Sequence, residues 1–241
     1  MVDRVPFLTA AGELERATTL NADLCGPFVR ALSVSGASIV TLGPTFGAET
    51  VCASDARAAR LAEIQLDLGE GPSWRAIAAH CPVLEPDMRH MTPGSWPVAA
   101  GAMRETGVRA VFAFPLVATG IDVGAVALHA MSPGGMTAQQ IDDASGLAAI
   151  VARQLLRRAA LALGTPEEDH GGGEGRYSRR EVHQATGMVV VQMGVTAVDA
   201  LLIIRGHAFA AGRPVRELAT DIVERLVDFT PDAGNGRSAA R

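Results

Sequence analysis

Apolar residues near the start of the chain recur with helical spacing. Steps of three and four separate the apolar members of residues 12–32, which predicts one amphipathic helix over this range. These members are Leu14, Ala17, Leu20, Leu24 and Phe28. Gly26-Pro27 falls inside the range and is expected to kink or split the helix, because proline cannot continue the hydrogen-bond ladder.

The next apolar runs have the length and composition of β-strands. Residues 37–42 and 49–53 are separated by a segment with Gly-Pro and Gly, which is typical of a hairpin loop. Residues 108–117 and 123–130 predict two adjacent antiparallel strands joined by a short loop. This region is therefore expected to contain an antiparallel sheet.

Further helices are predicted between and after these strands. Apolar positions from Ala58 to Leu68 have mostly helical spacing, and Pro72 follows a sharp glycine loop, where it suits the first turn of a short helix. Residues 98–106 form another helical run. A long helix over residues 136–163 closes the region.

A change of composition then divides the chain. Residues 164–175 contain five glycines, one proline and four acids, with no side chain suited to a core, so they predict a flexible linker. We expect one domain over residues 12–163 and a second over 176–229. Residues 230–241 are expected to form a disordered tail.

Helix start and stop signals divide the second domain into three helices. Gly194 ends the first, Thr196 is the N-cap of the second, Gly212 stops the second, and Pro214 opens the third. Their apolar stripes are Val182, Ala185, Val189 and Met193, then Ala200, Leu201, Ile204 and Ala208, then Val215, Leu218, Ala219, Ile222, Val223, Leu226 and Val227. Three helices of this length bury their stripes against one another, which predicts a small helical domain.

Composition and charge refine this division. The 241 residues are 48% hydrophobic, as in a globular protein, and their 21 basic residues, all arginine, face 26 acids. A net charge of −5 argues against a uniformly basic nucleic-acid or membrane binder. The segment from residue 176 onwards, however, holds nine arginines against seven acids and is the only part with a positive balance.

The first domain resembles a GAF domain in its order of elements and in four segments. These are Gln65-Leu-Asp-Leu-Gly-Glu-Gly-Pro72, Pro82-Val-Leu-Glu-Pro-Asp87, Gly107-Val-Arg-Ala-Val-Phe-Ala-Phe-Pro-Leu116 and Gly124-Ala-Val-Ala-Leu128. The resemblance implies a small-molecule pocket between a central antiparallel sheet and the loops of one face, and pairing through the terminal helices. It does not identify the ligand or any cofactor.

Trp74 and Trp96 are the candidate ligand contacts, because each indole can stack on a planar molecule. The alternative is that both tryptophans only pack in the core. The glycines beside Glu70 likewise form either a structural turn or a pocket wall, and the Glu70 carboxylate would oppose an anion there.

The second domain resembles an ANTAR domain in blocks at the spacing of that family. These are Val182-His-Gln-Ala-Thr-Gly-Met188, Gly194-Val-Thr-Ala-Val-Asp-Ala-Leu201, Arg205-Gly-His-Ala208 and Ala219-Thr-Asp-Ile-Val223. The resemblance implies an RNA-binding module of a bacterial transcription antitermination regulator, which acts as a dimer and holds paired stem-loops of a nascent transcript.

Seven residues of this domain are the candidate RNA contacts, since arginine offers planar donors to phosphates and bases in hairpin loops. They are Arg179, Arg180, His183, Gln184, Arg205, Arg213 and Arg216. Thr186 stands where many ANTAR sequences have lysine, which removes one phosphate contact. Between residues 176 and 229 seven arginines face six acids, so any basic patch must be local.

Cysteines and histidines offer little sign of catalysis or metal binding. Cys25, Cys52 and Cys81 lack a C-x-x-C spacing and are expected to be reduced, mostly buried thiols. His80, His90 and His129 lack metal-ligand spacing, so no metal site is predicted. A remote alternative is a GAF-type thiol reductase that acts on methionine sulfoxide.

The expected location is the cytoplasm. The first ten residues lack the apolar stretch and cleavage site of a secretory signal, and no run of about 18 apolar residues is present.

The sequence thus predicts an α+β protein, in which a GAF domain is joined by a flexible linker to a three-helix ANTAR domain. The predicted function is a signal-responsive, non-enzymatic regulator that binds RNA stem-loops and forms a homodimer. The alternative is a signalling protein whose helical domain dimerises or binds a protein partner without RNA.

Overall fold

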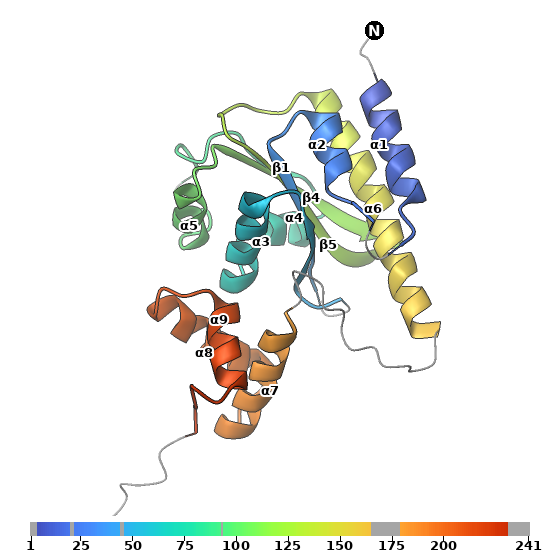
Figure 1. Cartoon of the computed structure of the whole chain (residues 1–241). Coiled ribbons are helices and arrows are strands. Elements are labelled where there is room, and N and C mark those ends of the chain that lie inside the picture. The colour runs from blue at the N-terminus through green and yellow to red at the C-terminus, as the bar shows by residue number, and fades with distance from the viewer. Residues whose placement is uncertain (1–3, 20–21, 44–45, 93, 165–178, 231–241) are drawn as a thin grey trace, which may run out of the picture. The chain divides into compact units, whose positions relative to one another are not determined.

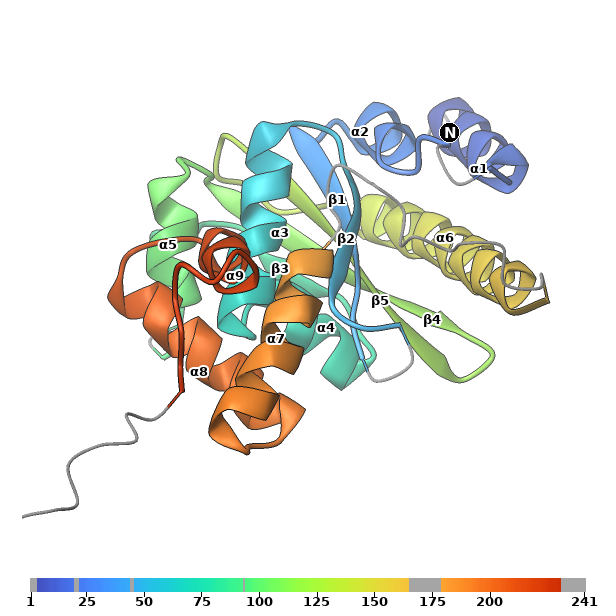
Figure 2. The same ribbon diagram turned by 60° about the horizontal axis from the view of Figure 1, so that its bottom comes forward.

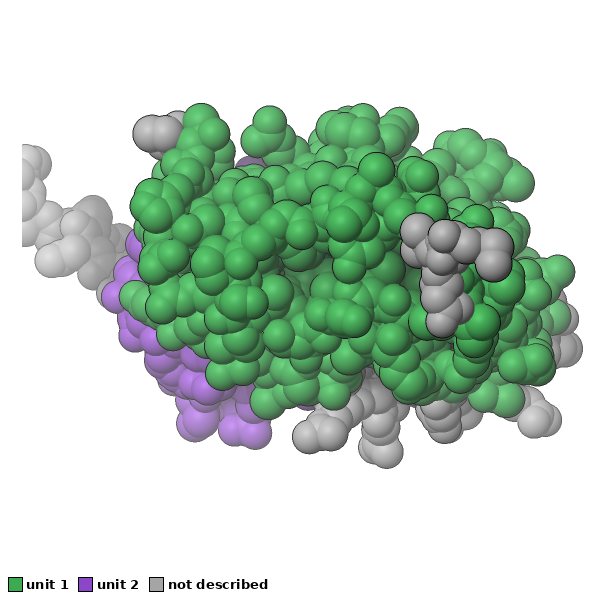
Figure 3. Space-filling view, turned by 90° about the horizontal axis from the view of Figure 1, so that it is seen from above, with its two compact units in different colours: residues 1–171 green, residues 172–241 purple. Residues whose placement is uncertain are grey.

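A computed structural model describes residues 4–19, 22–43, 46–92, 94–164 and 179–230. The chain separates into two compact units, residues 1–171 and 172–241, which are considered one at a time (Figure 3). Most of the predicted linker over 164–175 and nearly all of the predicted tail over 230–241 lie outside the described residues.

The first unit is built on a five-stranded antiparallel sheet with the strand order β2-β1-β5-β4-β3. Its strands are β1 (Gly36–Thr41), β2 (Glu49–Ala53), β3 (Val83–Glu85), β4 (Ala110–Ala118) and β5 (Ile121–Ala130). The two longest, β4 and β5, are buried along most of their length, which explains their nearly continuous apolar sequences.

Helices cover both faces of this sheet (Figures 1 and 2). One face packs against α1 (Val5–Arg16), α2 (Gly26–Leu32) and the long α6 (Ala138–Gly164), with the largest core cluster between them. On the other face lie α3 (Ala56–Leu68), α4 (Pro72–Ala79) and α5 (Ala99–Glu105). This is the antiparallel sheet flanked by helices that the GAF resemblance implies, so the predicted fold class is confirmed.

The second unit contains α7 (Arg180–Met193), α8 (Ala197–Ala210) and α9 (Val215–Val223) around one apolar cluster. Gly194 and Gly212 have the left-handed backbone of helix ends, with φ of 66° and 63°. The side chain of Thr196 accepts a hydrogen bond from the Asp199 N–H at 3.2 Å, as an N-cap should. The predicted starts and stops are therefore confirmed.

The helix predicted over residues 12–32 is split, as Gly26-Pro27 suggested, but its bounds were wrong, because α1 runs from Val5 to Arg16 and α2 begins only at Gly26. The structure has α1 and α2 with a break between them, although the apolar spacing continues through it. Asp23 Oδ1 accepts hydrogen bonds from the N–H groups of Cys25 and Gly26, at 3.0 and 2.8 Å, and so fixes the start of α2. The short strand β3 was also missed.

The third helix of the second unit ends earlier than its apolar stripe suggested. Arg225 has a φ of 62°, and the Leu226 N–H turns back to the Asp221 carbonyl at 2.8 Å. Leu226 is consequently 71% exposed and does not join the core.

The prediction of three reduced, mostly buried thiols was wrong. Cys25, at the start of α2, and Cys52, on β2, form a disulfide with their Cα atoms 6.3 Å apart, and Cys81 is exposed. The fold brings two positions 27 residues apart together, and their spacing in the sequence gave no sign of it.

No single helix in the described ranges is long and apolar enough to cross a membrane. Helices α7 and α8 pass such a test only when taken together, and the chain bends by 106° between them.

Candidate nucleic-acid interface

Helix α7 and the residue before it carry four of the seven predicted RNA contacts. The helix buries Val182, Ala185 and Val189, so the spacing of its sequence turns Arg180, His183 and Gln184 outward, where all three are exposed. Arg179 differs from them, because it is only 7% exposed and therefore presents little of its side chain to a partner.

An ion pair brings a further candidate to the first turn of α7. Arg216 Nε, on α9, lies 3.7 Å from Glu181 Oε2, next to Arg180 in the chain. Glu181, which directly follows Arg179 and Arg180 in the chain, is thus paired with Arg216 of α9. The resulting charge is local, as the near-neutral composition of the domain requires.

Arg213 and Arg205 occupy different surroundings. Arg213 contacts two acids of α9, Asp221 at 2.8 Å and Glu217 at 3.6 Å, and the hydrogen bond with Asp221 raises its pKa further. Much of its charge is therefore balanced within the domain. Arg205, on α8, is half-buried.

Thr186 does not extend toward solvent as a lysine at this position would. Its hydroxyl donates to the Val182 carbonyl one turn earlier on α7, at 2.7 Å, and the residue is half-buried. The position before Gly187 therefore offers no cation and little polar surface.

An open groove runs beside α7 and was not predicted. We call it the α7 groove, and its volume is ≈ 650 Å³. It lies between Gln184, Gly187, Met188 and Val191 of α7 and the segment from Val223 to Asp228. The sequence did contain a sign of this groove, in the run Met188-Val-Val-Val191. Four successive apolar residues of a helix cannot all face one core, so some of them must lie on the surface.

Helix α8 exposes large apolar side chains as well as burying others. Ala200, Ile204 and Ala208 are buried, while the side chains of Val198, Leu202 and Phe209 are each more than 60% exposed. Exposed apolar side chains gathered on one helix have the character of a contact surface.

The two tryptophans lie in different apolar clusters of the first unit. Trp74 Nε1 donates to the Gln65 carbonyl at 2.7 Å, and its ring packs beside the cluster of α3, α4 and the sheet. Trp96 is 9% exposed within the cluster around α5. The structure therefore does not bring them together as two walls of one site.

The segment from Gln65 to Ser73 ties three helices together. Gln65 Oε1 accepts from the Ser73 N–H at 2.8 Å, across Gly71, which has a φ of 131°. Glu70 Oε1 accepts from the N–H groups of Val98 and Ala99, at 2.8 and 2.7 Å. The Glu70 carboxylate is thus the anion at the start of α5, and the segment has a structural role.

The three histidines that were considered as metal ligands have separate acidic partners. His80 contacts Asp122 at 2.9 Å, and His90 contacts Asp87 at 2.8 Å. Among the described residues, no group of three or more His, Cys, Asp or Glu side chains is placed to hold a metal ion.

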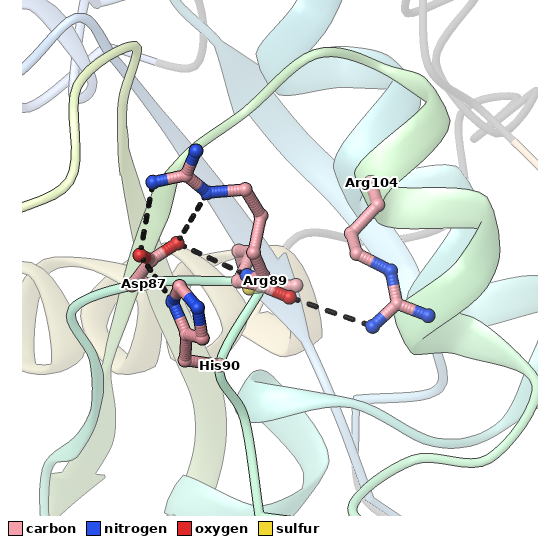
Figure 4. A network of polar contacts seen from close by, with 5 residues as sticks. Asp87, Arg89, His90 and Arg104 are labelled. Carbon is pink, nitrogen blue, oxygen red and sulfur yellow. Dashed lines mark hydrogen bonds and ion pairs between the residues drawn. The ribbon is translucent and has the colours of Figure 1, made fainter.

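Asp87 is the centre of an exposed polar network after β3 (Figure 4). Hydrogen bonds from the Arg89 side chain, and then from His90, hold the pKa of this carboxyl well below its usual range. Nearby, Arg104 of α5 reaches the Met88 carbonyl at 3.4 Å, which attaches the loop to the helix.

His129 is buried at the end of β5 beside Asp55. Burial lowers the pKa of His129, although the Asp55 carboxylate opposes this effect. Burial alone would raise the pKa of Asp55, but hydrogen bonds from the Ala58 N–H and the Ser54 hydroxyl, with the nearby His129, lower it.

One family model matches part of the second unit. Residues 176–223 match the family model of the ANTAR domain. Among curated proteins, no sequence matches the chain closely enough to be called a relative.

Several solved GAF domains are similar to the first unit. One, from a phosphoenolpyruvate-protein phosphotransferase of Coxiella burnetii, is 12% identical over 67% of this chain and 99% of its own, with a TM-score of 0.48. The GAF domain of nlh2 from A. aeolicus is 12% identical over 64% and 98%, with a TM-score of 0.44. That of the cyanobacteriochrome TePixJ is 18% identical over 61% and 95%, with a TM-score of 0.49.

Proposed function

We propose that this protein, whose residues 176–223 are an ANTAR domain behind a GAF-like unit, is a signal-responsive RNA-binding regulator of transcription antitermination. Domains of these two kinds are regulatory rather than catalytic. The ANTAR match is the observation that carries the proposal, and it coincides with the helices that expose Arg180, His183 and Gln184.

In this proposal the two units have different tasks. The GAF-like unit senses a small molecule or another signal in the cytoplasm, and the ANTAR domain binds stem-loops of a nascent transcript as part of a homodimer. Helix α6 is 27 residues long and lies next to the linker. In this proposal, a signal in the first unit changes how α6 pairs with another helix, and this change is transmitted to the second unit.

Filter binding of the full chain to transcripts with tandem hairpins tests the proposal. We expect tighter binding to them than to unstructured RNA of equal length and composition. Equal, weak binding to both would contradict it. A mass spectrum of the purified protein under native conditions would show any small molecule that accompanies the first unit.

Salt dependence distinguishes the predicted contacts from one another. Replacing exposed Arg180 by alanine should weaken binding. The slope of log Kd against log salt concentration should fall by about 1, because one counterion fewer is released. Arg213→Ala is the comparison, and we expect a smaller change in slope, because Asp221 and Glu217 already balance Arg213. Equal slopes for the Arg180 variant and the unmodified protein would remove Arg180 from the interface.

The second candidate function is a signalling module that docks on protein rather than RNA. The exposed apolar face of α8, with Val198, Leu202 and Phe209, favours it. Sedimentation equilibrium of Leu202→Glu tests whether this face joins two copies. A monomeric variant that retains hairpin binding would separate the two functions.

A further inference from the structure

The two ends of the Cys25–Cys52 disulfide differ in their access to solvent. Cys25 is 1% exposed, inside the apolar cluster between the sheet and helices α1, α2 and α6, whereas Cys52 is only half-buried on β2. β2 is an outer strand of the sheet, and its pairing with β1 shifts register just after Ile39, the partner of Cys52. A thiolate must reach one sulfur of a disulfide to break it, so Cys52 is the end at which attack is possible.

The bond fixes the start of α2, a helix that packs on α6. Cys25 is the N-cap residue of α2 and belongs to the same apolar cluster as Leu147 and Val151 of α6. Helix α2 also packs against α1. The crosslink therefore fastens this helical layer to the outer strand of the sheet.

The carboxyl-terminal half of α6 binds the end of α1 through hydrogen bonds. The buried Gln154 donates from Nε2 to the carbonyls of Leu14 and Glu15, at 3.0 and 2.8 Å. One turn later, Arg158 Nη2 donates to the Ala17 carbonyl at 3.1 Å. The crosslinked end of α2 follows only a few positions further along the chain. A movement of α2 would therefore disturb α6 both through the apolar cluster and through these hydrogen bonds.

We propose that the Cys25–Cys52 bond is a reversible redox site, and that breaking it loosens the contact of α1 and α2 with α6. In the cytoplasm, where the proposed function places the protein, thiols are kept reduced and disulfides are usually catalytic or redox-sensing. The inference rests on the proposed function and names a thiol–disulfide change as the signal that the first unit senses.

The reductant in this proposal is a dithiol. One of its thiolates attacks Cys52 Sγ, the S–S bond breaks, and the Cys25 sulfur leaves as a thiolate that takes up a proton. The second thiolate of the dithiol attacks its own bound sulfur and releases Cys52, so the dithiol loses two electrons and becomes a disulfide. A peroxide reverses the change, because the Cys52 thiolate displaces hydroxide from it to form a sulfenic acid, and the Cys25 thiol then displaces water.

Reduction of the folded protein tests the redox site. In Cys81→Ser, which keeps only the bonded pair, dithiothreitol should produce two thiols while circular dichroism remains that of the folded protein, and hydrogen peroxide should remove both. Thiols are counted by alkylation after an acid quench. Glutathione, a monothiol, should be trapped on Cys52 and not on Cys25, and trypsin separates the two positions at Arg30.

A matched pair of variants tests the contact with α6. Cys52→Ser cannot form the bond, whereas Cys81→Ser retains it. Hydrogen exchange around Gln154 should be about 5- to 150-fold faster in Cys52→Ser, the usual range of coupling between two sites. The Kd for tandem hairpins should differ between the variants by a factor in the same range. If Cys52→Ser does not fold, dithiothreitol-treated Cys81→Ser is measured in its place.

Each contrary result would overturn a different step. A bond that dithiothreitol breaks only after urea has unfolded the protein would be purely structural, and the proposed RNA function would stand. Reduction of the folded protein without faster exchange in α6 would remove the contact between the redox site and α6. Faster exchange with an unchanged Kd would exclude the bond as the signal. If neither redox form prefers hairpins to unstructured RNA, the proposed function fails, while exchange in α6 still tests the redox contact.

Discussion

At the scale of single residues, Gly36 shows how closely the first unit is packed around the buried His129. A Cβ on Gly36 would lie 2.1 Å from Asp55 Oδ2 and 2.3 Å from His129 Cε1. Asp55 accepts hydrogen bonds from the N–H groups of Arg57 and Ala58 at the start of α3, and His129 pairs with Gly36 across β1 and β5, so a shift of either residue disturbs an element of the fold. The sequence alone shows a glycine before a strand and does not reveal this contact.

Gly36→Ala should therefore lower the free energy of unfolding by about 1–3 kcal/mol, the usual cost of overfilling a packed site. Gly101→Ala, on α5, is the control, because a Cβ there meets no atom within 4 Å and alanine favours the helix. Urea unfolding measures both variants. Equal stability of the two would contradict the packing around His129.

His129 should also make stability depend on pH. Burial lowers its pKa in the folded state, so the unfolded chain binds this proton more readily, and stability is lost as pH falls below the ordinary value of about 6.5. Asp55, with its lowered pKa, adds a further loss of stability below the ordinary aspartate pKa of about 3.9. Unfolding of the unmodified protein and of His129→Gln is compared between pH values of about 7.5 and 5.5. His129→Gln should lose much less stability than the unmodified protein over this pH range. An identical loss of stability in both proteins would exclude His129 as its source.

At the scale of elements, local signals in the sequence were reliable where they act within one helix. Thr196, Gly194 and Gly212 mark helix ends through their own backbone or side chain, and these ends were predicted. The split between α1 and α2 was expected at Gly26-Pro27, but the length of the break was not, because Leu20 and Leu24 continue the helical spacing across it. Spacing records which side chains are apolar, and it does not record where backbone hydrogen bonds stop.

Glu70 illustrates what spacing cannot predict for the candidate sites. Its carboxylate caps α5, which begins 29 residues later in the chain. The α7 groove similarly combines α7 with the end of α9 and the residues after it, so only Gln184 among its residues was nominated from the sequence. Such sites depend on tertiary contacts between distant segments.

Replacing Glu70 by alanine should destabilise the first unit by about 1 kcal/mol, since two N–H groups at the start of α5 lose their acceptor. Hydrogen exchange should rise first at Val98 and Ala99. Glu63→Ala removes a carboxylate of α3 that pairs with Arg60 at 3.5 Å near the surface, and it should change little. Unchanged exchange at Ala99 would show that Glu70 is not the cap.

At the scale of the whole molecule, the disulfide joins two layers of the first unit. Cys25 belongs to the helical layer of α1, α2 and α6, and Cys52 to β2 at one side of the sheet. The crosslink restricts the unfolded chain between these positions. Its presence makes the stability of this unit sensitive to thiol reagents.

Reduction should lower the free energy of unfolding of the first unit by about 2–4 kcal/mol and leave the second unit unaffected, because all three cysteines lie before residue 172. Calorimetry with and without reductant measures the change. Cys81→Ser is the control and should behave as the unmodified protein. The number of thiols is counted by alkylation of the denatured protein without reductant. Three alkylated thiols, instead of one, would show that the disulfide is absent.

The two outer strands of the sheet have a consequence for its behaviour at high concentration. β3 has only three residues, and the part of β4 beyond it, residues 114–118, is mostly buried, so that edge offers little accessible backbone to another chain. At the opposite edge, the pairing of β2 with β1 shifts register between Ile39 and Val40, which interrupts a regular ladder. Both edges are therefore poor templates for strand addition, and the sheet is protected against growth into fibrils.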